Sequence, residues 1–175
     1  MEDWQSGDVD AFEDLFRRYE KMVFKNAYLV TGNRQDAEDI LQDVFTSVWK
    51  SRHTYDPTKG KLSTWLHRIT VNECFRKHRK VRPVLPLEGI DLPDNKQGLQ
   101  ESVEDRQEYD RLIDAMETLD GKHRSVLVLR YFNDLSYDEI AQAVDAPLGT
   151  VKSRINHALR ILRSRMGNEQ GGGHT

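Results

Sequence analysis

The chain has very little cysteine, no long apolar run and none of the usual motifs for holding metals or phosphates. Its one cysteine, Cys74, can neither form an internal disulfide nor supply a zinc site by itself, which suits a reducing compartment. No stretch of about 18 apolar residues is present to cross a membrane. The N-terminus is acidic where a signal peptide would be basic and then apolar. The sequence therefore predicts a cytoplasmic protein without membrane insertion.

Signals for catalysis are missing as well. There is no glycine-rich phosphate loop, no Cys-x-x-Cys pair and no His-Glu-x-x-His, and no two of the six histidines lie four residues apart. We therefore expect a protein that is not an enzyme and that needs no metal and no other cofactor. No strand candidate exceeds a few residues, and no repeat of about 20 to 50 residues occurs. The chain is predicted to be all-α.

What the chain does have is segregated charge. Although the formal net charge is only −3, residues 147–166 contain five Lys or Arg and no acid. Residues 61–82 contain seven bases and one acid, whereas residues 88–120 contain eleven acids and three bases. An acid-free cationic segment in an acidic protein favours a nucleic-acid partner over a merely solvated basic face.

The stretch from 135 to 166 predicts two helices joined by a tight turn. Ser136 followed by Glu139 is the pattern of a capping box, in which hydroxyl and carboxylate satisfy free backbone N–H groups at a helix start. Pro147 ends this first helix, and a second helix restarts at Gly149. The apolar stripe of the second helix consists of Val151, Ile155, Leu159 and Leu162. This is the helix-turn-helix arrangement, whose second helix enters the major groove of DNA.

The other side of this second helix is polar and basic. It offers hydrogen-bond donors to phosphates and base edges, which predicts DNA binding. The residues on this side are Lys152, Ser153, Arg154, Asn156, His157, Arg160 and Arg163. A helical hairpin with a solvated basic face is the alternative.

Two helices are expected near the N-terminus. Apolar residues at steps of three and four predict a first helix from about residue 8 or 10 to about residue 30. Gly32 suits the left-handed position after a helix, and Asn33 can cap the next helix at once. The second helix is predicted over 34–51, and such a short turn makes the two helices antiparallel neighbours.

The second helix carries an acidic strip. Asp36, Asp39 and Asp43 are spaced by three and four residues, so they share one side of the cylinder. Phe45 and Trp49 are near this strip, and not all of these large rings can point into one core. We therefore expect an exposed surface that binds a partner.

After a loop without periodicity over 53–61, a third helix is predicted with Ser63 as its cap. It continues into a basic run at 76–80, which predicts that this helix binds an anionic ligand. Prolines, glycines and acids then mark 83–98 as a linker.

The chain is thus predicted as two small helical domains joined by a flexible acidic linker that contains proline. Helical spacing returns over 103–119 and 122–132, so the second domain is expected to hold four helices and to end in the helix-turn-helix. The predicted boundaries are 1–82 for the first domain, 83–104 for the linker, 105–167 for the second domain and 168–175 for a disordered tail.

Four segments in one order carry a resemblance to a known family. They are DAEDILQDVF (36–45), LSTWLHRI (62–69) followed by Asn72, LSYDEI (135–140) and GTVKSR (149–154). With these motifs the chain resembles the extracytoplasmic-function sigma factors of bacterial RNA polymerase over about residues 8–166. The resemblance implies a two-domain helical subunit that binds core polymerase and directs transcription from particular promoters.

The resemblance also implies a role for each surface. The acidic helix is expected to dock on the clamp helices of the polymerase β′ subunit, and its implied contact residues are Asp39, Gln42, Asp43, Phe45 and Thr46. The loop and basic helix are expected to recognise and melt the minus-ten element through Tyr55, Lys59, Lys61, Asn72, Arg76, Lys77, Arg79 and Lys80. The second domain is expected to bind the β flap, and the minus-thirty-five element through Thr150, Lys152, Ser153, Arg154, Asn156, His157 and Arg160.

Three residues depart from the family's pattern. The family usually has an acid or amide where Arg76 stands, and often has Arg where His157 and Leu159 stand. Because histidine is mostly neutral at pH 7, we expect a weaker hold on phosphate there and a shifted promoter preference. The resemblance further implies an anti-sigma factor as a regulatory partner.

Two other functions stay open from the residues alone. A stand-alone helix-turn-helix regulator would bind duplex DNA tightly without polymerase, at operators with two-fold symmetry. A helical adaptor without a DNA role would tolerate alanine at Lys152 and Asn156 in any transcription assay.

Overall fold

The computed structural model describes residues 3–78 and 103–168, and every regular element in these ranges is a helix. In chain order they are η1 (Asp3–Ser6), α1 (Val9–Thr31), α2 (Arg34–Ser51), η2 (Arg52–Thr54), α3 (Leu62–His78), α4 (Val103–Glu117), α5 (Gly121–Leu127), η3 (Val128–Phe132), α6 (Tyr137–Ala143) and α7 (Leu148–Asn168). The predicted linker up to residue 102, the tail from residue 169, and Arg79 and Lys80 lie outside the described residues. The prediction of an all-α chain is confirmed.

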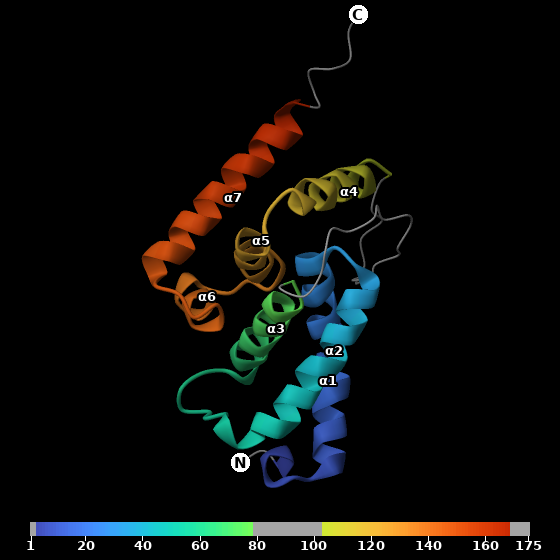
Figure 1. Cartoon of the computed structure of the whole chain (residues 1–175), viewed down its shortest axis with the longest axis vertical. Helices are drawn as coiled ribbons and strands as arrows, with labels where there is room; N and C mark the ends of the chain where they lie inside the picture. The colour runs from blue at the N-terminus through green and yellow to red at the C-terminus, as the bar shows by residue number, and fades with distance from the viewer. Residues whose placement is uncertain (1–2, 79–102, 169–175) are drawn as a thin grey trace, which may run out of the picture.

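The turn between helices α1 and α2 forms where Gly32 and Asn33 predict it. Asp8 caps α1 by accepting from two backbone N–H groups of the first turn, and Gly32 ends it in the left-handed conformation at φ 69°. Asn33 Oδ1 then accepts from the Asp36 N–H at 3.0 Å and starts α2. Because the turn is short, the two helices lie side by side in opposite directions (Figure 1).

Helix α3 packs against both α1 and α2. Leu66, Val71 and Cys74 are buried on its inner side. The expected cap is wrong by two residues, because the Trp65 N–H already donates to the Lys61 carbonyl at 3.2 Å. Ser63 therefore lies inside the first turn of α3 and does not cap it.

The helix-turn-helix is confirmed in detail. The Ser136 hydroxyl accepts from the Glu139 N–H at 3.2 Å, and the Glu139 carboxylate accepts from the Ser136 N–H at 2.9 Å, which is the predicted capping box. A turn with Asp145 at φ 49° leads through Pro147 into α7. Ahead of α6, α5 continues as one π-helical segment, η3, which the periodicity did not predict. The buried residues of α7 are Val151, Ile155, Ala158 and Leu162.

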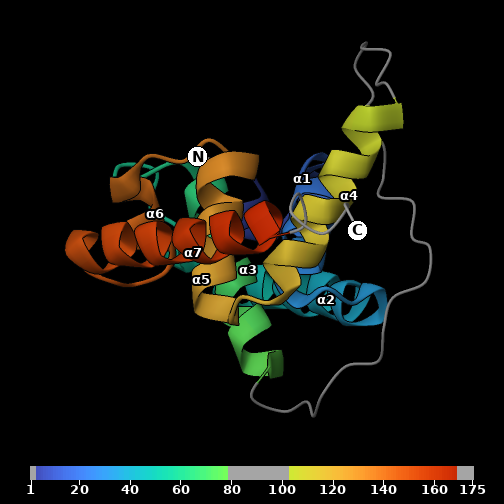
Figure 2. The same cartoon turned by 90° about the horizontal axis from the view of Figure 1, so that it is seen from above.

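The two helical domains pack directly on one another. Helix α6 lies against α3 and α5 lies against α1 (Figures 1 and 2), and the buried apolar residues form one continuous core. Arg124, which is 7% exposed, donates to the Val30 carbonyl at 3.1 Å. Asn133 Nδ2 donates to Asn26 Oδ1 at 2.8 Å, and Asn26 Nδ2 lies 3.0 Å from His67 Nδ1. Buried polar groups are thus paired across the boundary, which defines how the domains fit together.

No described helix combines the length and the hydropathy needed to span a bilayer.

Candidate nucleic-acid interface

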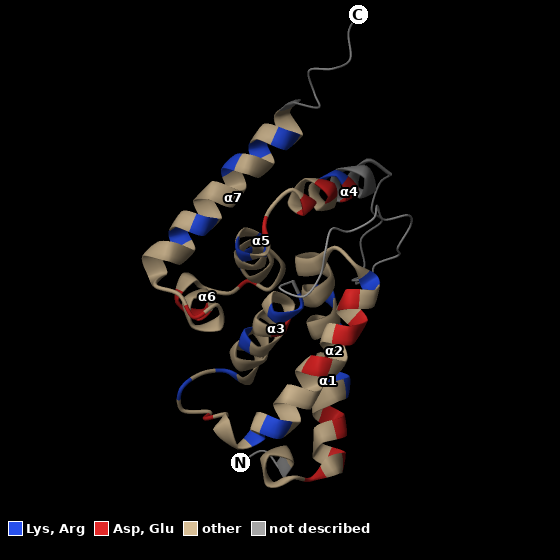
Figure 3. Cartoon of the chain, in the orientation of Figure 1, with Lys and Arg blue, Asp and Glu red and all other residues tan. Residues whose placement is uncertain are grey.

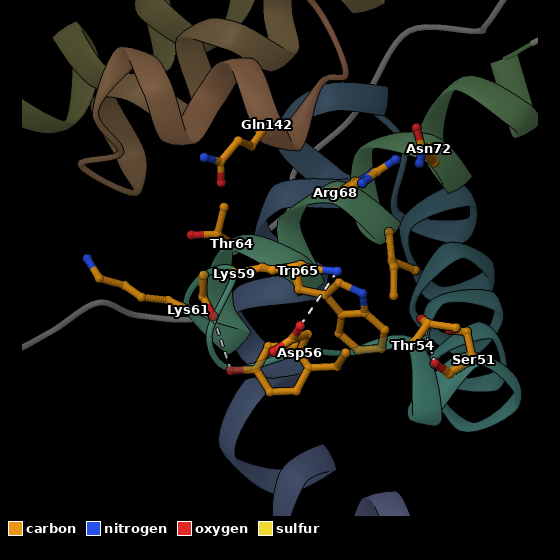
Figure 4. Close-up of a pocket in the computed structure, with 13 residues that line it drawn as sticks. Ser51, Thr54, Asp56, Lys59, Lys61, Thr64, Trp65, Arg68, Asn72 and Gln142 are labelled. Atoms are coloured by element: carbon orange, nitrogen blue, oxygen red, sulfur yellow. Dashed lines mark hydrogen bonds and ion pairs between the residues drawn. The ribbon is translucent and has the colours of Figure 1, made fainter.

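A cavity of about 480 Å³ opens between the loop after α2 and the first half of α3 (Figure 4). This volume is in the range of roughly 300–1,000 Å³ that is usual for small-ligand sites. Four of the predicted minus-ten residues line it, namely Tyr55, Lys59, Lys61 and Asn72. Trp65 and Arg68 of α3 and Gln142 of α6 also line it.

Three aromatic rings hold the loop that forms one side of the cavity. The ring centroids of Trp4 and Trp65 lie 6.1 Å and 5.5 Å from that of Tyr55. Gln5 Nε2 donates to the Tyr55 carbonyl at 2.8 Å, and the Tyr55 hydroxyl donates to the Gly60 carbonyl at 3.3 Å. The loop is therefore ordered by the N-terminal residues, a role for Trp4 that the sequence did not predict.

The rim of the cavity is mainly cationic. Asp56 accepts from the backbone N–H and the hydroxyl of Thr58 at 2.9 and 2.6 Å, and these bonds lower the pKa of its carboxyl. Asp56 is therefore ionised at neutral pH and lies 3.6 Å from Lys59 Nζ. Arg68 is exposed and makes no ion pair with any residue that the structure describes. A rim of this charge suits an anionic single strand.

Two other predicted minus-ten cations do not line the cavity. Arg76 Nη2 lies 2.9 Å from the Asp43 carboxylate, and Lys77 Nζ pairs with Asp39 and, at 3.4 Å, with Asp36. The hydrogen bond from Lys77 lowers the pKa of the Asp39 carboxyl. The predicted polymerase-docking acids and these predicted DNA-binding cations are thus bound to each other.

The acidic strip of α2 keeps a partly open surface. The side chains of Asp39 and Asp43 are 47% and 49% exposed, and Gln42 and Thr46 are exposed. Phe45 is a correction, because it is only 5% exposed and its ring packs at 4.7 Å against that of Phe16. The expectation of an exposed Phe45 ring beside the acids is therefore wrong.

Helix α7 presents the predicted cationic face to solvent (Figure 3). Its exposed candidates are Lys152, Ser153, Asn156, Arg160 and Arg163, whereas Thr150, Arg154 and His157 are half-buried. Since a guanidinium only donates, the 2.7 Å contact of Arg160 with His157 makes the imidazole Nδ1 the acceptor. The His157 ring also packs 4.8 Å from that of His123, so it is oriented by its neighbours.

Sequence reasoning missed several residues of the cavity, among them Arg68 and Gln142. Arg68 follows Trp65 by three residues and precedes Asn72 by four, so helical spacing was a sufficient signal for it. Gln142 had no such signal, because it comes from the other domain.

Neither a metal nor a reactive thiol is indicated in this part of the protein. No cluster of His, Cys, Asp and Glu that could hold a metal occurs within residues 3–78 and 103–168. Burial raises the pKa of the Cys74 thiol to about 12, so the thiol stays protonated.

Comparison with known proteins agrees with this geometry. Residues 15–83 match sigma-70 region 2, and residues 115–164 match sigma-70 region 4. The chain is 34% identical to the ECF RNA polymerase sigma factor RpoE of Cereibacter sphaeroides, over 91% of this chain and 88% of that one. It is 31% identical to the ECF RNA polymerase sigma factor SigW of Bacillus subtilis, over 93% and 92% of the two chains.

Solved structures show the same fold. The sigma factor RpoE of Bartonella quintana, solved with the anti-sigma factor NepR, has a TM-score of 0.70 at 20% identity and covers 91% of this chain and 98% of its own. CnrH, solved with the cytosolic domain of CnrY, has a TM-score of 0.68 at 24% identity and covers 94% and 92%.

A helix-turn-helix domain joined to a second helical domain with a cation-rimmed cavity defines a DNA-binding protein of the sigma-70 class. The chain belongs to the extracytoplasmic-function sigma factors, the RNA polymerase subunits that direct promoter-specific initiation of transcription. This membership does not agree with a stand-alone regulator or with an adaptor that has no DNA role.

Proposed function

We propose that the cavity beside α3 binds a base extruded from the minus-ten element. The observation that carries this proposal is the convergence of Tyr55, Lys59, Lys61 and Asn72 on one cavity. Its aromatic side chains suit a stacked base, the Asn72 amide offers a donor and an acceptor to the base edge, and the cations suit phosphates. Binding at this cavity would offset the unpairing free energy, about a few kcal/mol per flipped base.

The exposed face of α7 reads the minus-thirty-five element in the major groove. Lys152 and Arg163 contact phosphates, while Ser153 and Asn156, which are exposed, offer hydrogen bonds to base edges. Each phosphate contact contributes roughly −0.9 to the slope of log affinity against log salt concentration.

Helix α2 docks on the clamp helices of the polymerase β′ subunit through Asp39, Asp43, Gln42 and Thr46. Carboxylates beside neutral polar groups suit a basic helix, with charge-guided encounter. The second domain binds the β flap. The protein therefore acts in the cytoplasm as a regulatory subunit and not as an enzyme, and an anti-sigma factor is a partner, as it is for the solved relative RpoE.

The test is reconstitution with core RNA polymerase and a library of promoters, followed by mapping of transcription starts. We expect enrichment of one pair of promoter elements at a fixed spacing. Alanine at Asn72 should relax the preference within the minus-ten element alone, and alanine at Asn156 within the minus-thirty-five element alone. Absence of any enriched pair would refute these assignments.

A further inference from the structure

A short series of polar contacts joins the start of α5 to the cationic face of α7. Asp120 caps α5, and its Oδ1 atom lies 2.9 Å from the His123 backbone nitrogen and 2.8 Å from the His123 ring Nδ1. The His123 ring packs against that of His157, with the ring centroids 4.8 Å apart. His157 Nδ1 in turn lies 2.7 Å from Arg160 Nη2. Side chains of two helices that pack on each other are thus linked in series.

The position of the ring protons follows from these partners. Although partial burial disfavours its charge, the bonds from the backbone and the ring of His123 lower the pKa of the Asp120 carboxyl. An ionised carboxylate can only accept, so Nδ1 of His123 carries a proton and donates to it. A guanidinium can only donate, so Nδ1 of His157 carries no proton. The His157 ring therefore has its proton on Nε2.

This Nε2–H group of His157 is available to a ligand. It has no hydrogen-bond partner within the described residues, and it is not one of their buried polar atoms without a partner. The neighbouring Asn156 and Arg160 are exposed on α7, so the group lies within the cationic face. One face of the ring and its Nδ1 are already occupied, which leaves a single donor with a defined direction.

A single fixed donor can distinguish bases in the major groove. Guanine offers N7 and O6 as acceptors, adenine offers N7 and thymine offers O4, whereas cytosine offers only an amino donor. An imidazole that exchanged between its two tautomers would present a donor or an acceptor at Nε2 and would not exclude cytosine. Discrimination by His157 therefore depends on the groups that fix its tautomer and its orientation.

We propose that Asp120 and His123 are positioning residues for base recognition: they hold His157 so that its Nε2–H reads an acceptor on a base edge of the minus-thirty-five element. The proposal deepens the proposed function of α7 and rests on it. His123 acts through His157 and does not touch the DNA. This gives a reason for the second histidine, because a guanidinium has a rigid fork of donors, whereas an imidazole has to be oriented by its neighbours.

Nuclear magnetic resonance of the full chain with ¹⁵N-labelled histidine tests the fixed tautomer without DNA. Spectra are taken at about pH 8, well above the ordinary pKa of histidine, and His157→Gln assigns the ring signals by their loss. We expect an unprotonated Nδ1 and a protonated Nε2 in the wild type, and averaging of the two nitrogens in His123→Ala. An averaged His157 ring in the wild type would overturn the proposal, and so would a ring that His123→Ala leaves unchanged.

Selection by the holoenzyme from a library of minus-thirty-five elements tests base recognition. His157→Ala identifies the position that this residue reads, where we expect the wild type to disfavour cytosine about fivefold. His123→Ala should lower this discrimination to about twofold or less and leave the position read by Asn156 unchanged. The matched control is Lys122→Ala, an exposed neighbour in the same turn, which should alter the preference at no position.

A further variant separates positioning from the stability of α5. Asp120→Ser keeps a side chain that can cap the helix, but it offers no carboxylate to the His123 ring. We expect discrimination at the His157 position to fall about twofold with an almost unchanged urea midpoint. Full discrimination in this variant would mean that Asp120 only caps α5, which contradicts its positioning role.

The selection also distinguishes failure of this proposal from failure of the proposed function. If the wild-type holoenzyme enriches no minus-thirty-five element, the role of α7 in reading DNA is wrong. If it enriches an element in which His157→Ala or His123→Ala changes no position, α7 still reads DNA, but the positioning of His157 by α5 is refuted.

Discussion

The cations of α3 and those of α7 are prepared for the same kind of ligand in different ways. Arg76 and Lys77 on α3 are already paired with carboxylates of α2. Lys152 and Arg163 on α7 are exposed, and neither pairs with a carboxylate of the described residues. The exposed cations of α7 can therefore bind phosphate directly, whereas Arg76 and Lys77 of α3 must first release their carboxylate partners. Exposed ion pairs are worth about 0–1 kcal/mol each, so such an exchange is energetically accessible.

Reversing the charge of the α2 acids that pair with α3 should have the largest effect, a loss of binding to core polymerase. Asp39→Arg with Asp43→Arg is expected to weaken binding to core polymerase on the order of 1,000-fold, because like charges in an interface cost several kcal/mol. Binding is measured by co-purification and by fluorescence anisotropy without DNA. The control adds Arg76→Asp and Lys77→Asp, which restores the ion pairs inside the chain. Recovery of binding in this charge swap would show that the acids position α3 and do not dock.

Removing cations from α7 should have the next largest effect. Lys152→Ala and Arg163→Ala together are expected to weaken holoenzyme binding to promoter duplex about 100-fold at physiological salt and to flatten the salt slope by about 1.8. A salt titration of binding measures both quantities. Arg17→Ala with Lys21→Ala on α1, which are exposed cations elsewhere, is the control. An unchanged slope would remove α7 from the DNA interface.

The stability of the protein should depend on pH through His67, which is buried on α3 at the boundary between the two domains. Burial lowers the pKa of His67 to about 4, while an unfolded histidine titrates near 6.5. Between these values the unfolded chain binds the extra proton, so acid favours unfolding. The free energy of unfolding should fall by about 2 kcal/mol between pH 6.5 and pH 5 and should level off below pH 4.

Urea unfolding at each pH measures this change. His67→Gln should lose most of the slope, and His53→Gln, on the exposed 3-10 turn after α2, should keep it. The same slope in both variants would assign the pH dependence to other groups.

Removing the cap of α6 should have the smallest effect. Ser136→Ala leaves the Glu139 N–H without its side-chain acceptor and should lower the free energy of unfolding by about 1 kcal/mol. Ser164→Ala, at an exposed position inside α7, is the control and should leave stability almost unchanged. Urea midpoints compare the two variants, and equal midpoints would argue that the capping box does not hold α6.

Helix boundaries were predictable because their causes are local. Gly32 after α1, Asn33 before α2, and Ser136 with Glu139 at α6 all act over a few residues, and the structure has each of them in the predicted role. The start of α3 was missed, because Ser63 has the composition of a cap but the backbone of Lys61 already accepts the first helical bond. The π-helical segment η3 has no known signature in the periodicity.

The candidate site was predictable only where one helix face or one loop contains it. Lys59, Lys61 and Asn72 come from one loop and one helix, and the structure brings them to one cavity. Phe45 was wrongly expected at the surface, because the period of a helix does not tell which neighbour covers a face, and Phe16 of α1 covers this one. Gln142 could not be found at all, since only the packing of the domains brings it there.

Segregated charge and helical periodicity in the chain alone were enough to predict an all-α protein with a cationic helix-turn-helix. Tertiary packing decided the rest, including which cations are free. Lys77 is neutralised by Asp39 and Lys61 by Glu139, although these partners are 38 and 78 residues away in the chain. The charge pattern of the sequence identifies the groups that can attract a ligand. Which of these groups remain unpaired depends on the distances between opposite charges, and those distances are set only by the tertiary fold.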